Sequence, residues 1–268
     1  MEKRNSFLFE DNLLLDELKK RIEYSGKFFL FLDYDGTLAR IRKNPLSASL
    51  SKNKIMLLKK ISNNKKIVLT IISGRTIENL ILVSEINFLE KINIAGTHGS
   101  QLLIKNKYDL FKKSNICKLI KSIKKDIENL LTSHPCFKIE DKAISLAIHY
   151  RNCSKNSLQF LPKIKEIINF YEKNNPIKVM VMKKVIEIIP INIDKGQVIK
   201  IIKKREGYTE KSLIVCIGDD LTDEYLFKEN MKGINIKVTK KIKNKTSASY
   251  FLKNTTEVFN FLRIIGNN

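Results

Sequence analysis

Phe28-Phe29-Leu30-Phe31-Leu32-Asp33-Tyr34-Asp35-Gly36-Thr37-Leu38 joins five consecutive apolar residues to two acids, a glycine and a threonine. A short unbroken apolar run is typical of a strand that is buried on both faces of a parallel sheet. Gly36 allows the chain to turn sharply where that strand ends. Carboxylates are costly to bury unless they bind a metal or react, and open α/β sheets hold ligands at the carboxyl ends of their strands. Asp33 and Asp35 therefore predict a phosphoryl-transfer site.

The length and composition of the chain favour a folded, soluble protein. Of its 268 residues, 43% are hydrophobic and 29% are charged, which suits one large domain or a core with a smaller inserted module. No apolar segment approaches the ~20 residues that a membrane span requires, and acids within residues 10–17 interrupt the apolar centre of a signal peptide. The cysteines lack CxxC or zinc-ligand spacing, so we expect incidental thiols in a cytoplasmic protein; they are Cys117, Cys136, Cys153 and Cys216.

The formal net charge of +22 raises the question of nucleic-acid binding. Only eight of the 50 basic residues are arginine, the residue that base-reading and phosphate-binding surfaces favour. Lysine is instead spread along the whole chain together with abundant isoleucine and asparagine, which indicates a bias in base composition. We expect no nucleic-acid partner, although the excess charge would attract an anionic substrate in a salt-dependent way.

The expected strands and helices alternate at both ends of the chain. Strands are predicted at 28–32, 66–72, 92–95, 213–218 and 234–238, with helices at 49–61, 76–84, 194–204 and 255–265. This order is typical of βαβ units in a parallel doubly wound sheet. The middle of the chain instead combines paired strands with helices at 115–131 and 157–173, which describes a small α+β module. We predict a core of residues 1–106 and 190–268 and an insertion of residues 107–189.

Four separate polar clusters fall at the ends of predicted core strands or at the start of a core helix. Acids from two strand ends can hold Mg²⁺ through oxygen atoms, and the cation lets a negatively charged carboxylate approach a phosphate dianion. A serine at a helix start can bind phosphate oxygens, and a lysine stabilises the charge of the transition state. The clusters are Asp33 with Asp35, Ser73, Lys195, and Asp219 with Asp220 and Asp223.

The order of these motifs resembles that of the haloacid-dehalogenase-like (HAD) phosphatases. The motifs are DxDGT at 33–37, SGR at 73–75, DKG at 194–196 and GDDLTDE at 218–224. Over roughly residues 26–262 the chain closely resembles the trehalose-6-phosphate phosphatases, with further matching segments at 95–99, 139–142, 149–151 and 187–190. The resemblance implies an α/β fold with an HAD-like Rossmannoid parallel-sheet core and an inserted α+β cap of the C2 type.

The resemblance also implies a role for each core residue. Asp33 would attack phosphorus and form an aspartyl-phosphate, and Asp35 would act as general acid and then general base. Ser73 and Lys195 would complete the catalytic set. Mg²⁺ would be the cofactor, held by the Asp33 carboxylate, the Asp35 backbone carbonyl and Asp219, with Asp220 and Asp223 orienting the metal shell or Lys195.

By the same resemblance, the inserted module would select the substrate. Carboxylates and ammonium groups suit a sugar, because hydroxyl groups both donate and accept hydrogen bonds. The implied substrate-binding residues are Thr37, Arg75, His98, Glu140, Lys142, Arg151, Lys183 and Glu187. One position departs from the family pattern, since Ile189 stands where a basic residue is common.

Three functions stay open on these grounds. The first is hydrolysis of trehalose 6-phosphate, with a functional link to a trehalose-6-phosphate synthase and no membrane partner. The second is a related capped phosphatase for another sugar phosphate, such as sucrose 6-phosphate. The third is a basic nucleic-acid-binding protein without catalytic activity, against which the intact acids of the core stand.

Overall fold

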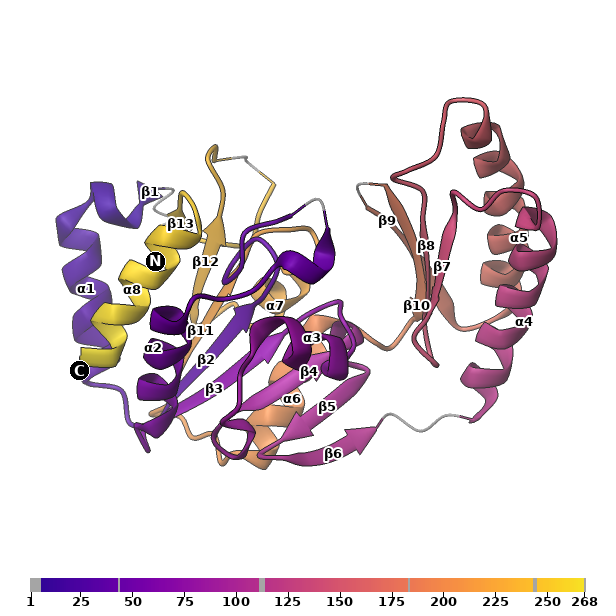
Figure 1. Cartoon of the computed structure of the whole chain (residues 1–268). Coiled ribbons are helices and arrows are strands. Elements are labelled where there is room, and N and C mark those ends of the chain that lie inside the picture. Colours follow the sequence, from indigo (N-terminus) through magenta and orange to yellow (C-terminus); the bar gives the residue numbers. More distant parts are fainter. Residues whose placement is uncertain (1–5, 43, 111–113, 183, 243–244, 268) are drawn as a thin grey trace. The chain divides into compact units, whose positions relative to one another are not determined.

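The computed structural model describes residues 6–42, 44–110, 114–182, 184–242 and 245–267. The chain divides into two compact units, shown in Figure 1. The first contains the described residues up to Leu110 and from Asp194 onward, and the second contains those between them. These boundaries lie four residues later than the predicted ones, at both ends of the insertion. The reason is that residues 107–110 form a strand of the core sheet, while Ile193 packs in the apolar centre of the second unit.

A nine-stranded sheet crosses the described part of the first unit in the order β1-β13-β12-β11-β2-β3-β4-β5-β6. The pairs from β1 to β4 are parallel, and β5 and β6 are antiparallel to their neighbours. The strands are β1 (Ser6–Phe7), β2 (Phe28–Asp33), β3 (Ile67–Ile72), β4 (Asn93–Gly96), β5 (Gln101–Ile104), β6 (Lys107–Leu110), β11 (Leu213–Gly218), β12 (Ile234–Val238) and β13 (Tyr250–Leu252). β2 lies at the centre of this sheet, and all six of its residues are buried, as the opening apolar run predicts.

Helices cover both faces of the core sheet (Figure 1). They are α1 (Asn12–Glu23), α2 (Lys52–Asn63), α3 (Ile77–Ser84), α6 (Lys195–Arg205), α7 (Glu224–Glu229) and α8 (Thr255–Asn267). Phe29 and Phe31 pack in a cluster with α6 and α7, whereas Leu30 and Leu32 pack in a cluster with α1, α2, α3 and α8. Alternate side chains of β2 therefore enter two different apolar layers, which explains why its apolar run is unbroken.

The sequence prediction missed two strands of this sheet. It took residues 234–238 as the last core strand, but β13 follows, and β1 pairs with β13 at the edge. These strands have three and two residues, so they are too short to show an apolar run.

The second unit is a four-stranded antiparallel sheet in the order β7-β8-β10-β9, with two helices on one of its faces (Figure 1). Its elements are α4 (Ser114–Leu131), β7 (Lys138–Asp141), β8 (Leu146–His149), α5 (Leu161–Asn174), β9 (Ile177–Met182) and β10 (Val185–Pro190). Leu146, Ile148, Ile186 and Ile188 pack in one cluster with α4 and α5. Alternate side chains of these strands point to the opposite face, which carries polar groups.

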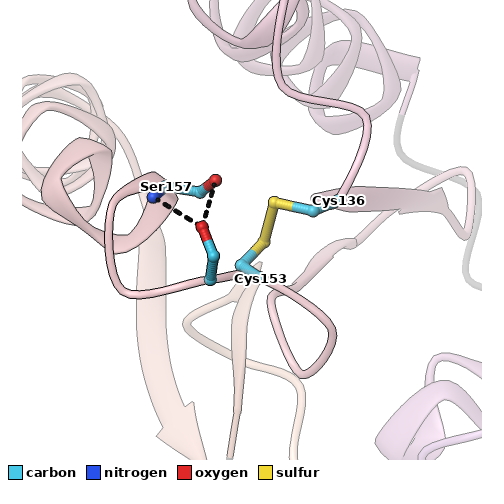
Figure 2. Close-up of a disulfide and its surroundings, with 4 residues drawn as sticks. Cys136, Cys153 and Ser157 are labelled. Atoms are coloured by element: carbon cyan, nitrogen blue, oxygen red, sulfur yellow. Dashed lines mark hydrogen bonds between the residues drawn. A yellow bond between two sulfur atoms is a disulfide. The ribbon is translucent and has the colours of Figure 1, made fainter.

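A disulfide joins Cys136 to Cys153 in the second unit, 17 residues apart (Figure 2). The bridged loop continues to Ser157, whose backbone N–H donates to Ser154 Oγ at 3.3 Å. The expectation of four incidental thiols is therefore wrong for this pair, while Cys117 and Cys216 are free thiols. Spacing alone did not reveal the bridge, because its partners belong to loops that only the folded sheet brings together. Disulfides are rare in the cytoplasm, so the cysteines do not support a cytoplasmic location.

Among the described residues, every helix is too short or too polar to span a lipid bilayer.

Candidate active site

A buried lysine bridges two carboxylates at the carboxyl edge of the core sheet. Asp33 ends β2, and Lys195 begins α6, where the side chain of Asp194 caps the helix by accepting from Gln197 N. Lys195 Nζ donates to Asp33 Oδ1 and to Asp223 Oδ1, at 2.7 Å each. The Lys195 side chain is 2% exposed. The start of α6 thus carries an ammonium group to the end of β2.

Asp223 fixes the loop that follows β11. Its Oδ2 accepts hydrogen bonds from the backbone N–H groups of Asp219 at 2.9 Å and Asp220 at 3.0 Å, while Oδ1 accepts from Lys195. Both oxygens of Asp223 are thereby engaged, so this residue orients the loop and the lysine. Asp220 has a partner within its own loop. Its Oδ1 accepts hydrogen bonds from Thr222 N at 2.7 Å and from Thr222 Oγ1 at 2.6 Å.

The excess of acids over lysine shifts the pKa values of the groups in this site. Burial, together with the nearby carboxylates, raises the pKa of Asp33 well above its usual range, despite the opposing charge of Lys195. Burial and Asp223 likewise raise the pKa of Asp219 to about 8. Burial alone would lower the pKa of Lys195, but Asp223 and Asp33 outweigh it and raise that pKa well above its usual range. Desolvation alone would raise the pKa of Asp220, but Lys195 and Thr222 lower it to about 2.

Three of these acids are close enough to share a divalent cation. One carboxylate oxygen each from Asp33, Asp219 and Asp223 lies within 4.8 Å of the others. Asp33 Oδ2 is buried and has no hydrogen-bond partner among the described residues, so it is open to a cation. A set of carboxylate oxygens suits a hard cation such as Mg²⁺. Since Asp223 is engaged on both oxygens, Asp33 and Asp219 are the better direct ligands.

The turn after β2 lies against the loop that follows β11. Gly36 has φ +94°, and its N–H donates to Ala39 O at 2.7 Å. A Cβ at Gly36 would lie 2.1 Å from Asp219 Oδ2, so only glycine fits both the backbone and the space. The next residue, Thr37, is fully buried, and its Oγ1 has no partner within the described chain. That hydroxyl is available to a phosphate oxygen.

Arg75 pairs with Asp35. Arg75 Nε donates to Asp35 Oδ2 at 2.6 Å, and Nη2 donates to Asp35 Oδ1 at 2.7 Å. The same guanidinium also donates to Pro45 O at 2.9 Å and to Asn79 Oδ1 at 3.3 Å. A two-point arginine–carboxylate contact fixes geometry as well as charge. Arg75, expected to bind substrate, therefore holds the second acid of the DxD motif.

Ser73 and His98 lie on neighbouring loops at the same sheet edge. Ser73 follows β3 and is 1% exposed, and its Oγ accepts from Arg75 N at 3.1 Å. His98 is 4% exposed and follows β4, and its N–H donates to Ser73 O at 3.0 Å. The structure thus brings Ser73 and His98 together through the backbone.

The polar face of the second unit carries three of the predicted sugar-binding residues. Glu140 and Glu187 both stand opposite Ala147 in the strand register, so they share one face of that sheet. Lys142 Nζ donates to Glu187 Oε1 at 2.8 Å, and this pair is almost fully buried. His149 Nε2 lies 2.9 Å from Glu140 Oε2, and this hydrogen bond lowers the pKa of Glu140.

The sequence singles out three further positions in this part of the chain. Arg151 is exposed in the loop after β8. Lys183 lies outside the described residues. Ile189, the departure from the family pattern, is 1% exposed and lies on the same face of the sheet as Glu187.

The sequence prediction missed three supporting residues. Thr222 holds Asp220, and its place two residues after that acid is a local signal for such a turn. Asn79 supports Arg75 from one helical turn further along the chain. His149 was not among the predicted site residues, although it lies in the family-matching segment 149–151. Its pairing with Glu140 depends on the strand register of the sheet.

The chain resembles known phosphatases along most of its length. A sequence model of the family described as Trehalose-phosphatase matches residues 31–256. The chain is 30% identical over 285 residues to the protein named Probable trehalose-phosphate phosphatase H of Arabidopsis thaliana, covering 97% of this chain and 78% of that protein. It is also 30% identical over 244 residues to Alpha,alpha-trehalose-phosphate synthase (UDP-forming) B of Dictyostelium discoideum, covering 87% of this chain and 29% of that protein.

A solved structure has the same fold. The C-terminal domain of a C. albicans trehalose-6-phosphate phosphatase superposes with a TM-score of 0.79 at 23% identity, covering 94% of this chain and 96% of that chain. This likeness confirms the predicted fold, a parallel-sheet core with an inserted α+β unit.

Proposed function

Since the chain belongs to the trehalose-phosphatase family, we propose that it hydrolyses trehalose 6-phosphate to trehalose and orthophosphate. One observation carries the mechanism: Lys195 is buried between Asp33 and Asp223, while the second oxygen of Asp33 has no partner among the described residues. A carboxylate held on one oxygen and open on the other is positioned to act as a nucleophile.

In the proposed reaction, an oxygen of Asp33 bonds to phosphorus while the bond from phosphorus to the sugar oxygen breaks. Asp35 gives a proton to the leaving sugar oxygen. Water then attacks the aspartyl-phosphate, and Asp35 takes up the proton that water loses. Orthophosphate leaves, and Asp33 returns to its starting state.

The neighbouring groups would hold the phosphate during both steps. Lys195 supplies a fixed positive charge, and Ser73 and Thr37 offer hydroxyl donors to the phosphate oxygens. We assign a Mg²⁺ site to Asp33, Asp219 and the Asp35 backbone carbonyl, with Asp223 and Asp220 supporting that loop. The cation supplies positive charge that offsets the repulsion between Asp33 and the phosphate dianion.

Arg75 has a positioning role in this proposal. Its two hydrogen bonds hold the Asp35 carboxyl group in one orientation. Pro45 and Asn79 hold the guanidinium in turn. Proton transfer depends on such placement, because a general acid must lie within hydrogen-bond reach of the leaving oxygen.

We assign sugar recognition to the second unit, as a substrate-specificity cap. Glu140, Lys142 and Glu187 would bind sugar hydroxyl groups from one sheet face, and Arg151 and Lys183 would add contacts to the sugar or the phosphate. His98 would contribute from the core. The synthase named among the relatives supports a functional link between this reaction and the one that makes its substrate.

Phosphate release from a panel of sugar phosphates tests the proposal. The panel contains trehalose 6-phosphate, sucrose 6-phosphate and glucose 6-phosphate, each with Mg²⁺ and with a chelator. We expect release from trehalose 6-phosphate above the other two, and only with the metal. A preference for either of the other sugar phosphates would overturn the substrate assignment. Phosphate release in the presence of chelator would overturn the metal requirement.

A further inference from the structure

A pocket of about 410 Å³ opens at the edge of the core sheet that lies opposite the Asp33 edge. Its lining includes Lys27, just before β2, and Ile67 and Asn93, which begin β3 and β4. The catalytic groups stand where these parallel strands end. Since β3 has six residues, and a strand rises about 3.3 Å per residue, the two sites lie roughly 20 Å apart.

Four lysines line this pocket against one carboxylate. They are Lys27, Lys65, Lys91 and Lys105, and the carboxylate is Glu206. Lys105 Nζ donates to Glu206 Oε2 at 2.8 Å, and Lys27 Nζ donates to the backbone oxygen of Glu206. The buried Glu206 thereby fixes two of the ammonium groups, and the pocket retains an excess of positive charge. Such a lining attracts an anion.

Asn93 adds a polar group that the protein leaves unsatisfied. It lines the pocket and is 2% exposed, and its Oδ1 has no hydrogen-bond partner within the described residues. A buried acceptor without a partner is destabilising, so such a group points to a bound donor. The phosphate group of a sugar phosphate dianion supplies no donor for it, whereas a sugar hydroxyl group does.

From these two features we infer that the pocket binds a sugar monophosphate at a site separate from the catalytic one. The phosphate would meet the lysines, and a sugar hydroxyl would donate to Asn93 Oδ1. The volume falls within the range of about 300–1,000 Å³ that is usual for small-molecule sites. This inference does not depend on which sugar phosphate the catalytic site hydrolyses.

Calorimetric titration of the full chain with glucose 6-phosphate, in chelator so that no turnover occurs, tests the site. The double variant Lys65→Ala with Lys91→Ala removes two exposed lysines of the pocket and leaves both partners of Glu206 in place. The control, Lys52→Ala with Lys59→Ala, removes the same charge from the exposed side of α2. We expect the pocket variant to weaken one binding component at least about tenfold, because charged hydrogen bonds are lost, and the control to retain it.

Three outcomes would overturn the inference. The pocket variant binds as the wild type does, or the control loses as much affinity as the pocket variant. In the third, inorganic sulfate, a tetrahedral dianion without a hydroxyl group, binds that component as tightly as glucose 6-phosphate does. Asn93→Ala adds a check, since it should reduce the preference for glucose 6-phosphate over sulfate. Phosphatase activity measured with Mg²⁺ should be unchanged in both lysine variants, which separates this site from the catalytic one.

Discussion

The two units of the chain each bury a lysine against carboxylates, and they balance the charges differently. In the core, the Lys195 ammonium faces Asp33 and Asp223 while Asp219 adds a further acid. In the second unit, Lys142 and Glu187 form a pair of one cation and one anion. The core site therefore needs another positive charge, which suits a metal-assisted reaction of a phosphate. The paired charges of the second unit suit neutral hydroxyl groups.

The largest effect is expected from Asp33→Asn, which removes the proposed nucleophile. The amide cannot form the aspartyl-phosphate, so phosphate release should fall by at least about 10⁴-fold. The fold should persist, because asparagine has almost the same shape. Phosphate release and far-UV circular dichroism measure the two effects. Metal-dependent turnover close to that of the wild type would refute the covalent route.

Two further variants test the charge comparison between the units directly. Lys195→Met and Lys142→Met each remove the cation of a buried ion pair, so each should lose about 3–5 kcal/mol of unfolding free energy. Millimolar Mg²⁺ should restore stability to Lys195→Met alone, since a cation that binds only the folded state stabilises it. Thermal unfolding with and without Mg²⁺ provides the measurement. Equal recovery of both variants would show that the two units do not differ in this way.

Breaking the disulfide should have a smaller effect, confined to the second unit. A bridge that closes a loop of 17 residues stabilises by about 3 kcal/mol, so Cys136→Ser should lose that amount without reductant. With reductant, wild type and variant should unfold alike. Cys117→Ser is the matched control, since that thiol is free, and it should change neither result. Urea unfolding of the four samples decides the question, and an unchanged Cys136→Ser midpoint without reductant would contradict the prediction.

The smallest effect concerns Glu140 and His149. The hydrogen bond from His149 lowers the pKa of Glu140 below its ordinary value of 4.5. The pair therefore stabilises the fold above pH 4.5, and this contribution is lost as pH falls through the lowered pKa. Both side chains are more than a third exposed, so His149→Ala should cost less than about 1 kcal/mol. An NMR titration should show the pKa of Glu140 rising in the variant, and an unchanged pKa would remove the basis for this pairing.

The fold was predictable where sequence pattern and burial coincide. The apolar run before Asp33 predicts a strand that is buried on both faces, and all six residues of β2 are buried between β11 and β3. The strands β1 and β13 were not predictable, since three residues or fewer carry no periodicity. The first boundary of the insertion moved because β6, which pairs with β5, belongs to the core sheet, and that membership has no mark in composition.

The site was predictable as a set of residues, and less so as a set of contacts. The clusters at 33, 195, 219 and 223 converge because parallel strands end at one edge. The contact of Arg75 with Asp35, 40 positions apart, depends on how two loops meet above the sheet. The pairing of Glu140 with His149 likewise depends on strand register.

The central strand also sets the order in which the molecule can assemble. β2 pairs on one side with β3, which follows soon after, and on the other with β11, where Phe28 stands opposite Leu213. Pairing between segments so far apart in sequence is slow, because a large loop must close first. A chain leaving the ribosome therefore presents β2 with one edge unpaired until residues 213–218 have been made. The active site is completed late in folding, after the inserted unit has been synthesised.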